Sequence, residues 1–264
     1  MDLQLTNKTA VVTGSTAGIG FAIASLLAQE GAAVVVNGRS QKRVDEAIEH
    51  IRRARKDAHV TGVAADLGAS EGVEMLTASV PQVDILVNNL GIFEPKPFTE
   101  IPDEDWLRFF EINVLSGVRL SRFYLPGMLQ RNWGRIVFIS SESALNIPVE
   151  MIHYGVTKTA QIALARGLAE TTAGTNVTVN SVLAGPTRSE GVNGFLQELA
   201  KAQGASIDTL EKEFFRSVRP SSLLKRFATP EEVAAMVVYV CSPVASATNG
   251  AALRVEGGVV RSIV

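Results

Sequence analysis

Short runs of apolar, largely β-branched residues recur along the 264-residue chain, separated by longer segments whose apolar residues return every three or four positions. The short runs are continuously apolar, as is typical of strands covered by helices on both faces of a sheet. They predict seven strands, at 8–13, 32–37, 59–66, 83–89, 135–140, 176–183 and 251–258. The longer segments predict helices, the first over 18–31 with Gly31 ending it, and the second over 41–56.

The alternation of strand and helix covers nearly the whole chain. Because parallel strands joined by helices cross over with one hand, it predicts an open, doubly wound α/β fold with helices on both faces of the sheet. Neither an internal repeat nor a linker interrupts the pattern, so residues 1–264 are expected to form a single domain.

The exception to the strand rhythm is the insertion 185–229, whose apolar positions follow helical spacing. These positions are Phe195, Leu196, Leu199, Leu210, Phe214 and Phe215. An insertion after the carboxyl end of a strand is where α/β proteins place ligand-covering lids. A purely structural excursion is the alternative.

Charge and composition narrow the kind of partner. The chain has 25 basic and 27 acidic residues, and no long run of one sign, which gives no reason to expect a nucleic acid or a membrane surface. No apolar run approaches the roughly 18 residues of a membrane span, and the N-terminus lacks a signal pattern, so a cytoplasmic protein is expected. The single cysteine, Cys241, is expected to be a buried apolar residue, and a Cys-based metal site is excluded.

A glycine-rich turn, "TGSTAGIG" (13–20), joins the first strand to the first helix. Glycines permit a tight turn and let the amides at a helix N-terminus approach a dinucleotide diphosphate. The spacing G-x3-G-x-G differs from the common G-x-G-x-x-G, and a plain structural turn would also need glycines. After the second strand no carboxylate flanks Gly38, and Arg39 suits a 2′-phosphate, which favours NADP(H) over NAD(H). A solvated arginine opening a helix is the alternative for Arg39.

Two further candidates follow the third and fourth strands. Asp66 could accept a hydrogen bond from an adenine amino group, or cap the helix that starts near Ala69. The "NNLG" segment (88–91) could hold a cofactor and the neighbouring backbone, or form an Asx turn.

Tyr154 and Lys158, in "YGVTK", lie one helical turn apart and so share a face. A tyrosine phenol has a pKa of about 10. A nearby ammonium lowers that pKa, so the phenol can act as an acid or base near neutral pH. Ser141 closes the fifth strand and could hold a substrate carbonyl against the phenol. His153 points about 100° away from this face and is expected at the pocket rim or the surface.

The motifs "TGSTAGIG", "NNLG", Asn113, "ISS" and "YGVTK" occur in the order and spacing of the short-chain dehydrogenase/reductase family, which the chain resembles through to "LRVEGG" (253–258). The resemblance implies a Rossmann-type fold and hydride transfer between a nicotinamide cofactor and a carbonyl or alcohol. It also implies that Lys158 hydrogen-bonds the nicotinamide ribose and that Asn113 holds a water linked to Lys158. Homotetramers or homodimers are expected, packed through the helices around 104–130 and 155–173.

The residues and the resemblance together predict three sets of site residues. The catalytic residues are Asn113, Ser141, Tyr154 and Lys158. The cofactor-binding residues, for NADP or else NAD, are Gly14, Ser15, Thr16, Gly18, Ile19, Gly20, Arg39, Asp66, Leu67, Asn89, Gly91, Tyr154, Lys158, Gly185, Pro186 and Thr187. The substrate-binding residues are Ser141, Ser143 and Tyr154, and no metal is expected.

Departures from the family pattern bear on the substrate. Leu90 replaces a usual alanine and could crowd the nicotinamide, and Ala184 stands where the family usually has proline. A reductase of a small-molecule ketone or aldehyde is the first hypothesis, and a 3-oxoacyl-(acyl-carrier-protein) reductase is the second. For the second, Arg131 matches a carrier-docking position by its spacing, whereas Thr175 falls where another basic residue would be. A non-catalytic dinucleotide-sensing protein is the third, although such a protein would be expected to lose Tyr154 or Lys158.

Overall fold

Seven parallel strands form one sheet in the computed structural model, which describes residues 1–263 apart from the side chains of Phe195 and Gln203. The strands are β1 (Thr9–Val12), β2 (Ala33–Gly38), β3 (Val60–Ala64), β4 (Ile85–Asn88), β5 (Gly134–Ser141), β6 (Val177–Ala184) and β7 (Ala252–Val255). Their order is β3-β2-β1-β4-β5-β6-β7, so the direction of winding reverses between β1 and β4. All seven predicted strands and the doubly wound topology are confirmed.

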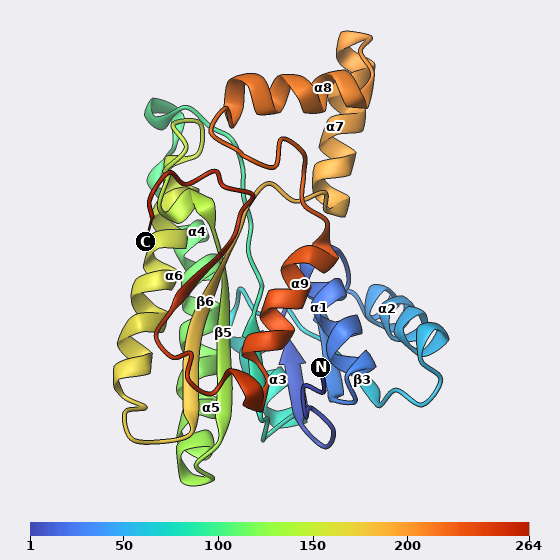
Figure 1. Ribbon diagram of the computed structural model, residues 1–264, viewed down its shortest axis with the longest axis vertical. Helices are drawn as coiled ribbons and strands as arrows, with labels where there is room; N and C mark the ends of the chain where they lie inside the picture. The colour runs from blue at the N-terminus through green and yellow to red at the C-terminus, as the bar shows by residue number, and fades with distance from the viewer. Residues whose placement is uncertain (264) are drawn as a thin grey trace.

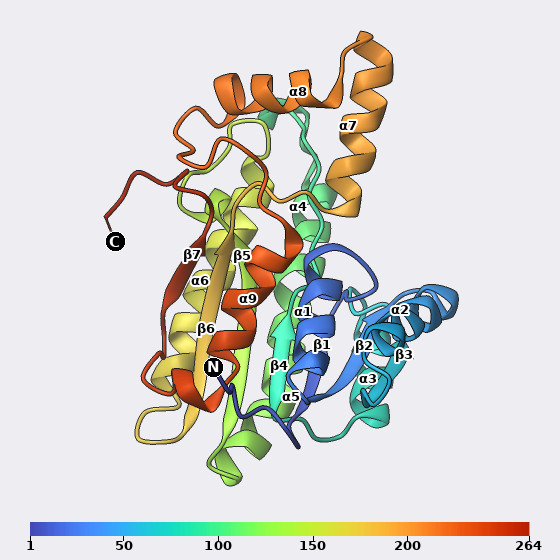
Figure 2. The same ribbon diagram turned by 45° about the vertical axis from the view of Figure 1, so that its right-hand side comes forward.

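Helices cover both faces of this sheet (Figures 1 and 2). One face carries α1 (Gly18–Gln29), α2 (Gln41–Ala54) and α9 (Pro230–Val240). The other carries α3 (Ser70–Ser79), α5 (Ser116–Gln130) and α6 (Ile152–Glu170). Gly31 follows α1 with a φ of 92°, so it ends this helix as predicted.

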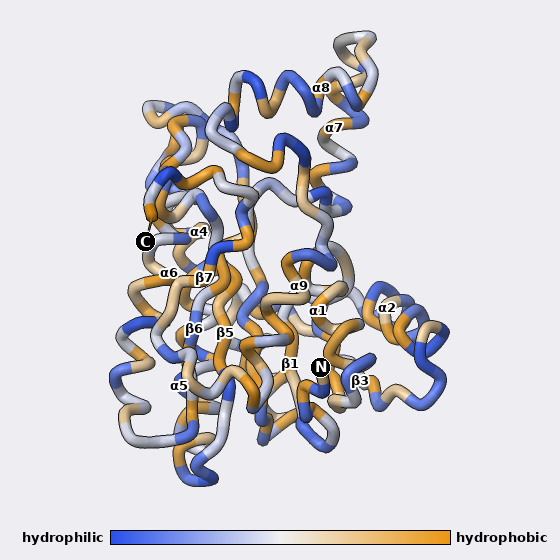
Figure 3. The backbone as a smooth tube through the Cα atoms, in the orientation of Figure 1, coloured by the Kyte–Doolittle hydropathy of each residue, from blue (hydrophilic) through white to orange (hydrophobic). Residues whose placement is uncertain are grey.

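Alternate residues of each strand supply two separate apolar cores. In β2, for example, Val34 and Val36 pack with α1 and α2, whereas Val35 packs on the opposite face. Successive strand side chains point to opposite faces, and both faces are covered, so apolar residues are favoured at successive positions. Figure 3 shows the resulting apolar colouring along the strands, with polar residues on the outer turns.

A helical stretch with a π-turn precedes β5. It consists of α4 (Asp103–Phe110), the π-turn Glu111–Leu115 and then α5 without a break. Asn113 lies in the π-turn. Such turns displace the backbone carbonyls from their usual partners and occur frequently at functional sites. Shorter 3-10 turns occupy Phe98–Glu100, Glu142–Ala144 and Pro243–Ala245.

The insertion 185–229 folds into α7 (Glu190–Gln203), α8 (Ile207–Glu213) and a π-turn at Phe214–Val218. Thr187 pairs with Ala228 as neighbouring parallel strands do, so the two ends of the insertion run side by side. Figure 1 shows α7 and α8 standing beyond the carboxyl ends of the strands. Leu196, Leu210 and Phe215 form a small core there with Phe227, and Leu199 and Phe214 pack against it. The side chain of Phe195 lies outside the described part.

Three sequence expectations concern single groups or segments. Cys241 is fully buried, and burial raises the pKa of its thiol to about 12. Within residues 1–263, no helix combines the length and the apolar character needed to cross a membrane. Among the same residues, no three His, Cys, Asp or Glu side chains gather as a metal site would require.

Candidate active site

Ser141, Tyr154 and Lys158 meet at the carboxyl end of β5. Ser141 is the last residue of β5, and Tyr154 and Lys158 occupy the first turns of α6. The Ser141 hydroxyl faces the Tyr154 phenol, whose ionised form a hydrogen bond from Ser141 would stabilise, and the Ser141 oxygen accepts one from the Ser143 amide at 3.1 Å. The neighbouring Ser140 donates instead to the backbone carbonyl of Lys158 at 2.9 Å. Ser140 therefore fixes α6 against β5, while Ser141 faces the phenol.

Burial dominates the electrostatics of Tyr154. It raises the pKa of the phenol to about 12, although the hydrogen bond from Ser141 opposes the rise. The Lys158 ammonium lies 5.6 Å from the centre of the tyrosine ring and donates to the Ile139 carbonyl at 2.9 Å. The net shift of the Tyr154 pKa is therefore opposite to the expected one, because burial outweighs any lowering by Lys158. Lys158 is itself buried, which lowers its pKa to about 8.

Asn113 connects three segments around Lys158. Its side-chain oxygen accepts from the Ile92 amide at 2.7 Å, and its side-chain nitrogen donates to the Thr157 hydroxyl at 3.0 Å. Its backbone carbonyl accepts from the side chain of Gln161 at 2.5 Å. Gln161 was not among the predicted residues. The signal for it was an amide side chain in the otherwise apolar "AQIALA" segment of α6.

The glycine-rich turn requires glycine at several positions. Gly14 and Gly18 have φ values of 58° and 56°, a backbone region that other residues rarely adopt. A Cβ on Gly20 would lie 2.5 Å from the Gly14 carbonyl oxygen. Helix α1 begins at Gly18, and no side chain of the described residues caps its N-terminus. Its first amides can therefore take an anion such as a diphosphate.

Asn37, at the end of β2, holds this turn in place. Its side-chain oxygen accepts from the Gly14 amide at 3.1 Å, and its carbonyl accepts from the Ser15 amide at 2.8 Å. The buried Ser15 hydroxyl donates to the Val12 carbonyl and accepts from the Asn37 amide. Both polar groups of Ser15 thus serve the turn itself. Asn37 was not among the predicted site residues. Its polar side chain in the otherwise apolar strand "VVVNG" is the sequence feature that could have indicated its role.

Arginines lie beyond the carboxyl end of β2. Arg39 is exposed directly after Gly38, where a Cβ would meet the Thr16 methyl at 2.5 Å. Thr16 therefore packs under the chain that carries Arg39. Arg43, one turn into α2, forms an ion pair with Glu190 of α7 at 2.7 Å.

Asp66, Leu67 and Asn89, which follow β3 and β4, have different roles, and of these three only Asn89 hydrogen-bonds to the glycine-rich turn. Asp66 accepts from the Gly68 amide at 3.0 Å, and α3 starts after Ala69 without a side-chain cap in the described chain, so the helix-cap alternative for Asp66 is wrong. The Leu67 side chain is buried in the core. Asn89 donates to the Thr13 and Gly14 carbonyls at 2.9 and 3.0 Å.

Other predicted cofactor residues lie around this centre. Ile19 packs against the apolar core below α1. A Cβ on Gly91 would lie 3.4 Å from the Lys158 ammonium. A Cβ on Gly14 would lie 3.6 Å from Leu90 Cδ1, so the Leu90 side chain lies next to the glycine-rich turn. After β6, a Cβ on Gly185 would lie 2.5 Å from the backbone of Glu256, so this position too requires glycine.

Pro186 and Thr187 open the insertion. The Pro186 carbonyl accepts from the Ala228 amide at 2.9 Å. The Thr187 hydroxyl donates to the Gly185 carbonyl at 2.9 Å, and it is buried. This hydroxyl keeps its oxygen available as an acceptor, as a carboxamide would require.

His153 lies outside the site. It is fully buried, and its ring centre is 4.0 Å from that of Phe109. Burial lowers its pKa. The expectation of a rim or surface position is wrong, because the direction about 100° away from Tyr154 leads into the contact between α6 and α4.

A buried ion pair anchors the insertion next to Ser141. Arg219 donates to Glu142 at 2.8 Å and to Glu150 at 3.2 Å. Burial raises the pKa of Glu142, although Arg219 opposes this shift. Ser143, predicted as a substrate contact, is buried, and its side chain helps to lower the pKa of Glu142.

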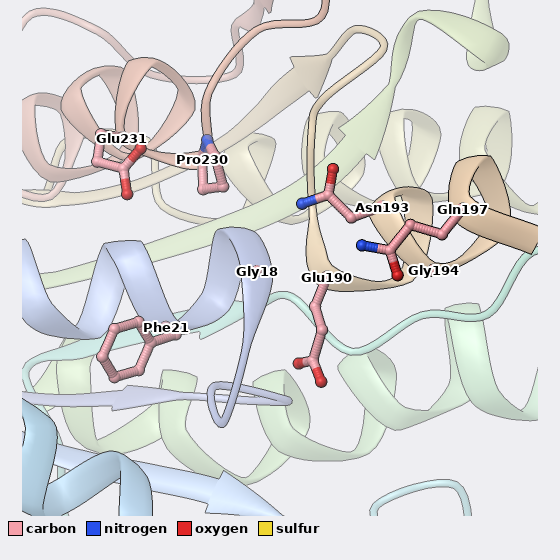
Figure 4. A pocket seen from close by; sticks show the side chains of 8 residues that line it. All are labelled: Gly18, Phe21, Glu190, Asn193, Gly194, Gln197, Pro230 and Glu231. Carbon is pink, nitrogen blue, oxygen red and sulfur yellow. The ribbon is translucent and has the colours of Figure 1, made fainter. Parts of the chain in front are cut away.

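A cavity of about 570 Å³ separates the glycine-rich turn from the insertion (Figure 4). Gly18 and Phe21 of α1 line one side, and Glu190, Asn193, Gly194 and Gln197 of α7 line the other, with Pro230 and Glu231 at the N-terminus of α9. Ser141, Tyr154 and Lys158 are not part of its wall. Of the residues that line it, Gly18 belongs to the predicted cofactor set.

Comparisons with known proteins agree with this fold and site. The family model described as short chain dehydrogenase matches residues 8–200. Two uncharacterized oxidoreductases of Bacillus subtilis, YvrD and YvaG, are 50% and 49% identical over the full length of both chains. The crystal structure of L-sorbose reductase from Gluconobacter frateurii complexed with NADPH and L-sorbose superposes with a TM-score of 0.93 at 33% identity, again over 100% of each chain. The chain belongs to the short-chain dehydrogenase family of oxidoreductases.

Proposed function

We propose that the protein interconverts a small-molecule ketone or aldehyde and the corresponding alcohol with NADP(H), using Tyr154 as the general acid and base. The observation that carries the proposal is the convergence of Ser141, Tyr154 and Lys158 at the end of β5, beside the glycine-rich turn. A protein that only sensed a dinucleotide would need the turn but not this cluster.

The cluster is suited to moving one proton. The Ser141 hydroxyl, which faces the phenol, would donate a hydrogen bond to the substrate carbonyl oxygen and hold it against Tyr154. Tyr154 gives that oxygen a proton in reduction and takes it back in oxidation. The high pKa of about 12 keeps Tyr154 protonated before reduction. For oxidation, the nearby Lys158 ammonium and a positively charged nicotinamide favour the phenolate.

The cofactor preference rests on the end of β2. The uncapped N-terminus of α1 fits a diphosphate, and Arg39 supplies a forked donor for a 2′-phosphate. A bound NADP(H) would supply or accept the hydride. The neighbouring structure solved with NADPH supports the same preference.

The insertion is proposed as a lid over the substrate. It rises from the carboxyl end of β6 and is anchored by Arg219 to Glu142, the residue after Ser141. A free small molecule is favoured over a carrier-bound acyl chain because Thr175 stands where a second basic residue would dock an acidic carrier. The L-sorbose bound in the neighbouring structure makes polyhydroxylated ketones the first substrates to test.

The test is a panel of ketones, aldehydes, sugars and alcohols, with NADPH or NADP oxidation state followed by absorbance. Turnover by the wild-type protein and a loss of about 10²–10⁴-fold in kcat for Tyr154→Phe are expected. Tyr239→Phe is the matched control, because it removes the same hydroxyl group from a partly exposed tyrosine of α9 outside the predicted site. Wild-type rates in Tyr154→Phe would overturn the role of Tyr154, and tighter binding of NADH than NADPH would overturn the cofactor assignment.

A further inference from the structure

Gln161 is a fully buried amide beside the proposed catalytic cluster, with an exposed fraction of 1%. It lies on α6 three residues after Lys158, so the two side chains lie on neighbouring parts of one helix surface. A buried amide has both a donor and an acceptor end to satisfy, and leaving either unpaired is costly. Its partners therefore decide its role.

Both ends of the Gln161 amide contact the catalytic cluster. The nitrogen donates to the backbone carbonyl of Asn113 at 2.5 Å, and the oxygen accepts from the Lys158 ammonium at 3.2 Å. The carbonyl of Asn113 lies in the π-turn that interrupts α4 and α5. One side chain thus links the turn to the lysine.

The second contact restrains the ammonium. Gln161 and the Ile139 carbonyl accept two of the three donors of Lys158. The same nitrogen lies 3.4 Å from the Cβ position of Gly91, on the side of the predicted cofactor. The two hydrogen bonds therefore hold the Lys158 ammonium between Tyr154 and Gly91.

The geometry points to Gln161 as a positioning residue for Lys158. Its amide ties the ammonium to the π-turn at Asn113. Because an amide has no titratable proton near neutral pH, Gln161 restrains the ammonium without taking its proton while Tyr154 exchanges a proton with the substrate. This inference rests on the function proposed above, in which Lys158 acts on the phenol.

Two substitutions of Gln161 separate positioning from packing. Gln161→Glu keeps the shape and places a carboxylate against the ammonium, so the titration of Lys158 should move upward by about 1–3 pH units. Gln161→Met keeps much of the volume and removes both hydrogen bonds, so the titration should move downward. These shifts are read without cofactor from the NMR signal of [ε-13C]lysine, assigned with Lys158→Arg.

Kinetics give the second measurement. Gln161→Met should lower kcat by about 10-fold or more through misplacement of the charge, and Gln161→Glu should move the pH profile of kcat/KM in the same direction as the lysine signal. Thr159→Val is the control, because Thr159 lies on the same helix but its hydroxyl bonds to the carbonyls of Ala144 and Gly155 rather than to Lys158. It should leave the lysine signal and the profile unchanged.

The outcomes distinguish the two proposals. If the wild-type protein turns over substrate and Tyr154→Phe does not, but both Gln161 variants keep the wild-type lysine titration and pH profile, the role of Gln161 is refuted alone. A lower melting temperature without those shifts would likewise show that Gln161 contributes only to packing. If Tyr154→Phe is as active as the wild type, the proposed function itself fails.

Discussion

At the scale of single residues, Lys158 is an ammonium held inside the protein at a cost. Burial lowers its pKa to about 8, whereas a lysine in an unfolded chain titrates near about 10.4. Between these values the unfolded chain binds more protons than the native protein, so the free energy of unfolding rises with pH across this window. Below the window both states are protonated and the cost is present in full.

Comparison with Lys158→Met isolates this contribution, since all other ionisable groups are shared. From about pH 7 to about pH 10, the free energy of unfolding of the wild type should rise by about 2–3 kcal/mol relative to the variant. Urea unfolding at the two pH values measures it. A difference between the two proteins that stays constant with pH would show that Lys158 titrates as in a free chain.

Gly20 illustrates a residue whose absence of a side chain matters. A Cβ there would lie 2.4 Å from the side-chain nitrogen of Asn89 and 2.5 Å from the Gly14 carbonyl oxygen. These two atoms form a hydrogen bond that stabilises the turn. Gly20→Ala should lower the free energy of unfolding by about 1–3 kcal/mol and weaken NADPH binding, measured by denaturation and by fluorescence titration.

Gly194→Ala is the matched control for Gly20→Ala. Gly194 lies inside α7, and a Cβ there has no atom of the described residues within 4 Å. This change should raise stability by about 0.5–1 kcal/mol, because alanine loses less conformational freedom in a helix. Equal effects of the two substitutions would contradict the close contact at Gly20.

At the scale of elements, the anchor of the insertion is an ion pair removed from water. The Arg219 and Glu142 side chains are 8% and 4% exposed. Arg219→Met leaves Glu142 as an uncompensated buried charge and should destabilise the protein by about 3–5 kcal/mol. The double variant Glu142→Gln with Arg219→Met removes both charges, so it should lose less than Arg219→Met alone. Chemical denaturation of both proteins measures the difference.

Arg216 provides the control within the same insertion. It pairs with Glu213 at 2.7 Å, but both side chains are exposed, so Arg216→Met should cost less than about 1 kcal/mol. Limited proteolysis of the chain between α7 and α8 should accelerate in Arg219→Met and not in Arg216→Met. Similar behaviour of the two would show that Arg219 does not anchor the insertion.

The elements were predictable because each leaves a local pattern. The strands are rich in Val, Ile and Leu, and the helices of the insertion show Leu196, Leu199 and Leu210 at helical spacing. The partners of polar residues leave no such pattern. Gln161 reaches Asn113 across 48 positions and Arg219 reaches Glu142 across 77, so only the folded chain shows these pairs.

The surface position expected for His153 and the lowered Tyr154 pKa expected from Lys158 were wrong for a related reason. Helical spacing gave the side of α6 on which each lies, but it did not say what packs there. For His153 the neighbour is Phe109 of α4, and for Lys158 the acceptor is the Ile139 carbonyl of β5. Both contacts depend on how helices and sheet dock, which the periodicity of one helix does not specify.

At the scale of the whole molecule, large apolar side chains remain exposed along the continuous stretch from α4 through the π-turn to α5. Leu107, Leu115 and Phe123 are 71%, 37% and 46% exposed. Grouped exposed apolar residues mark association surfaces, and this stretch coincides with the segment 104–130 expected to pack between subunits. Light scattering after size-exclusion chromatography should therefore give a mass of two or four chains for the wild type.

Phe123→Glu combined with Leu107→Glu should shift that mass toward one chain, because charges would be buried unpaired in the interface. Val149→Glu is the control: Val149 is 81% exposed, but it lies in the loop before α6, away from this stretch. A variant that dissociates and loses activity would show that Asn113, in the π-turn at the centre of the stretch, is held in place by the partner. A wild-type protein that elutes as one chain would refute the interface, because these side chains would then face water in the working enzyme.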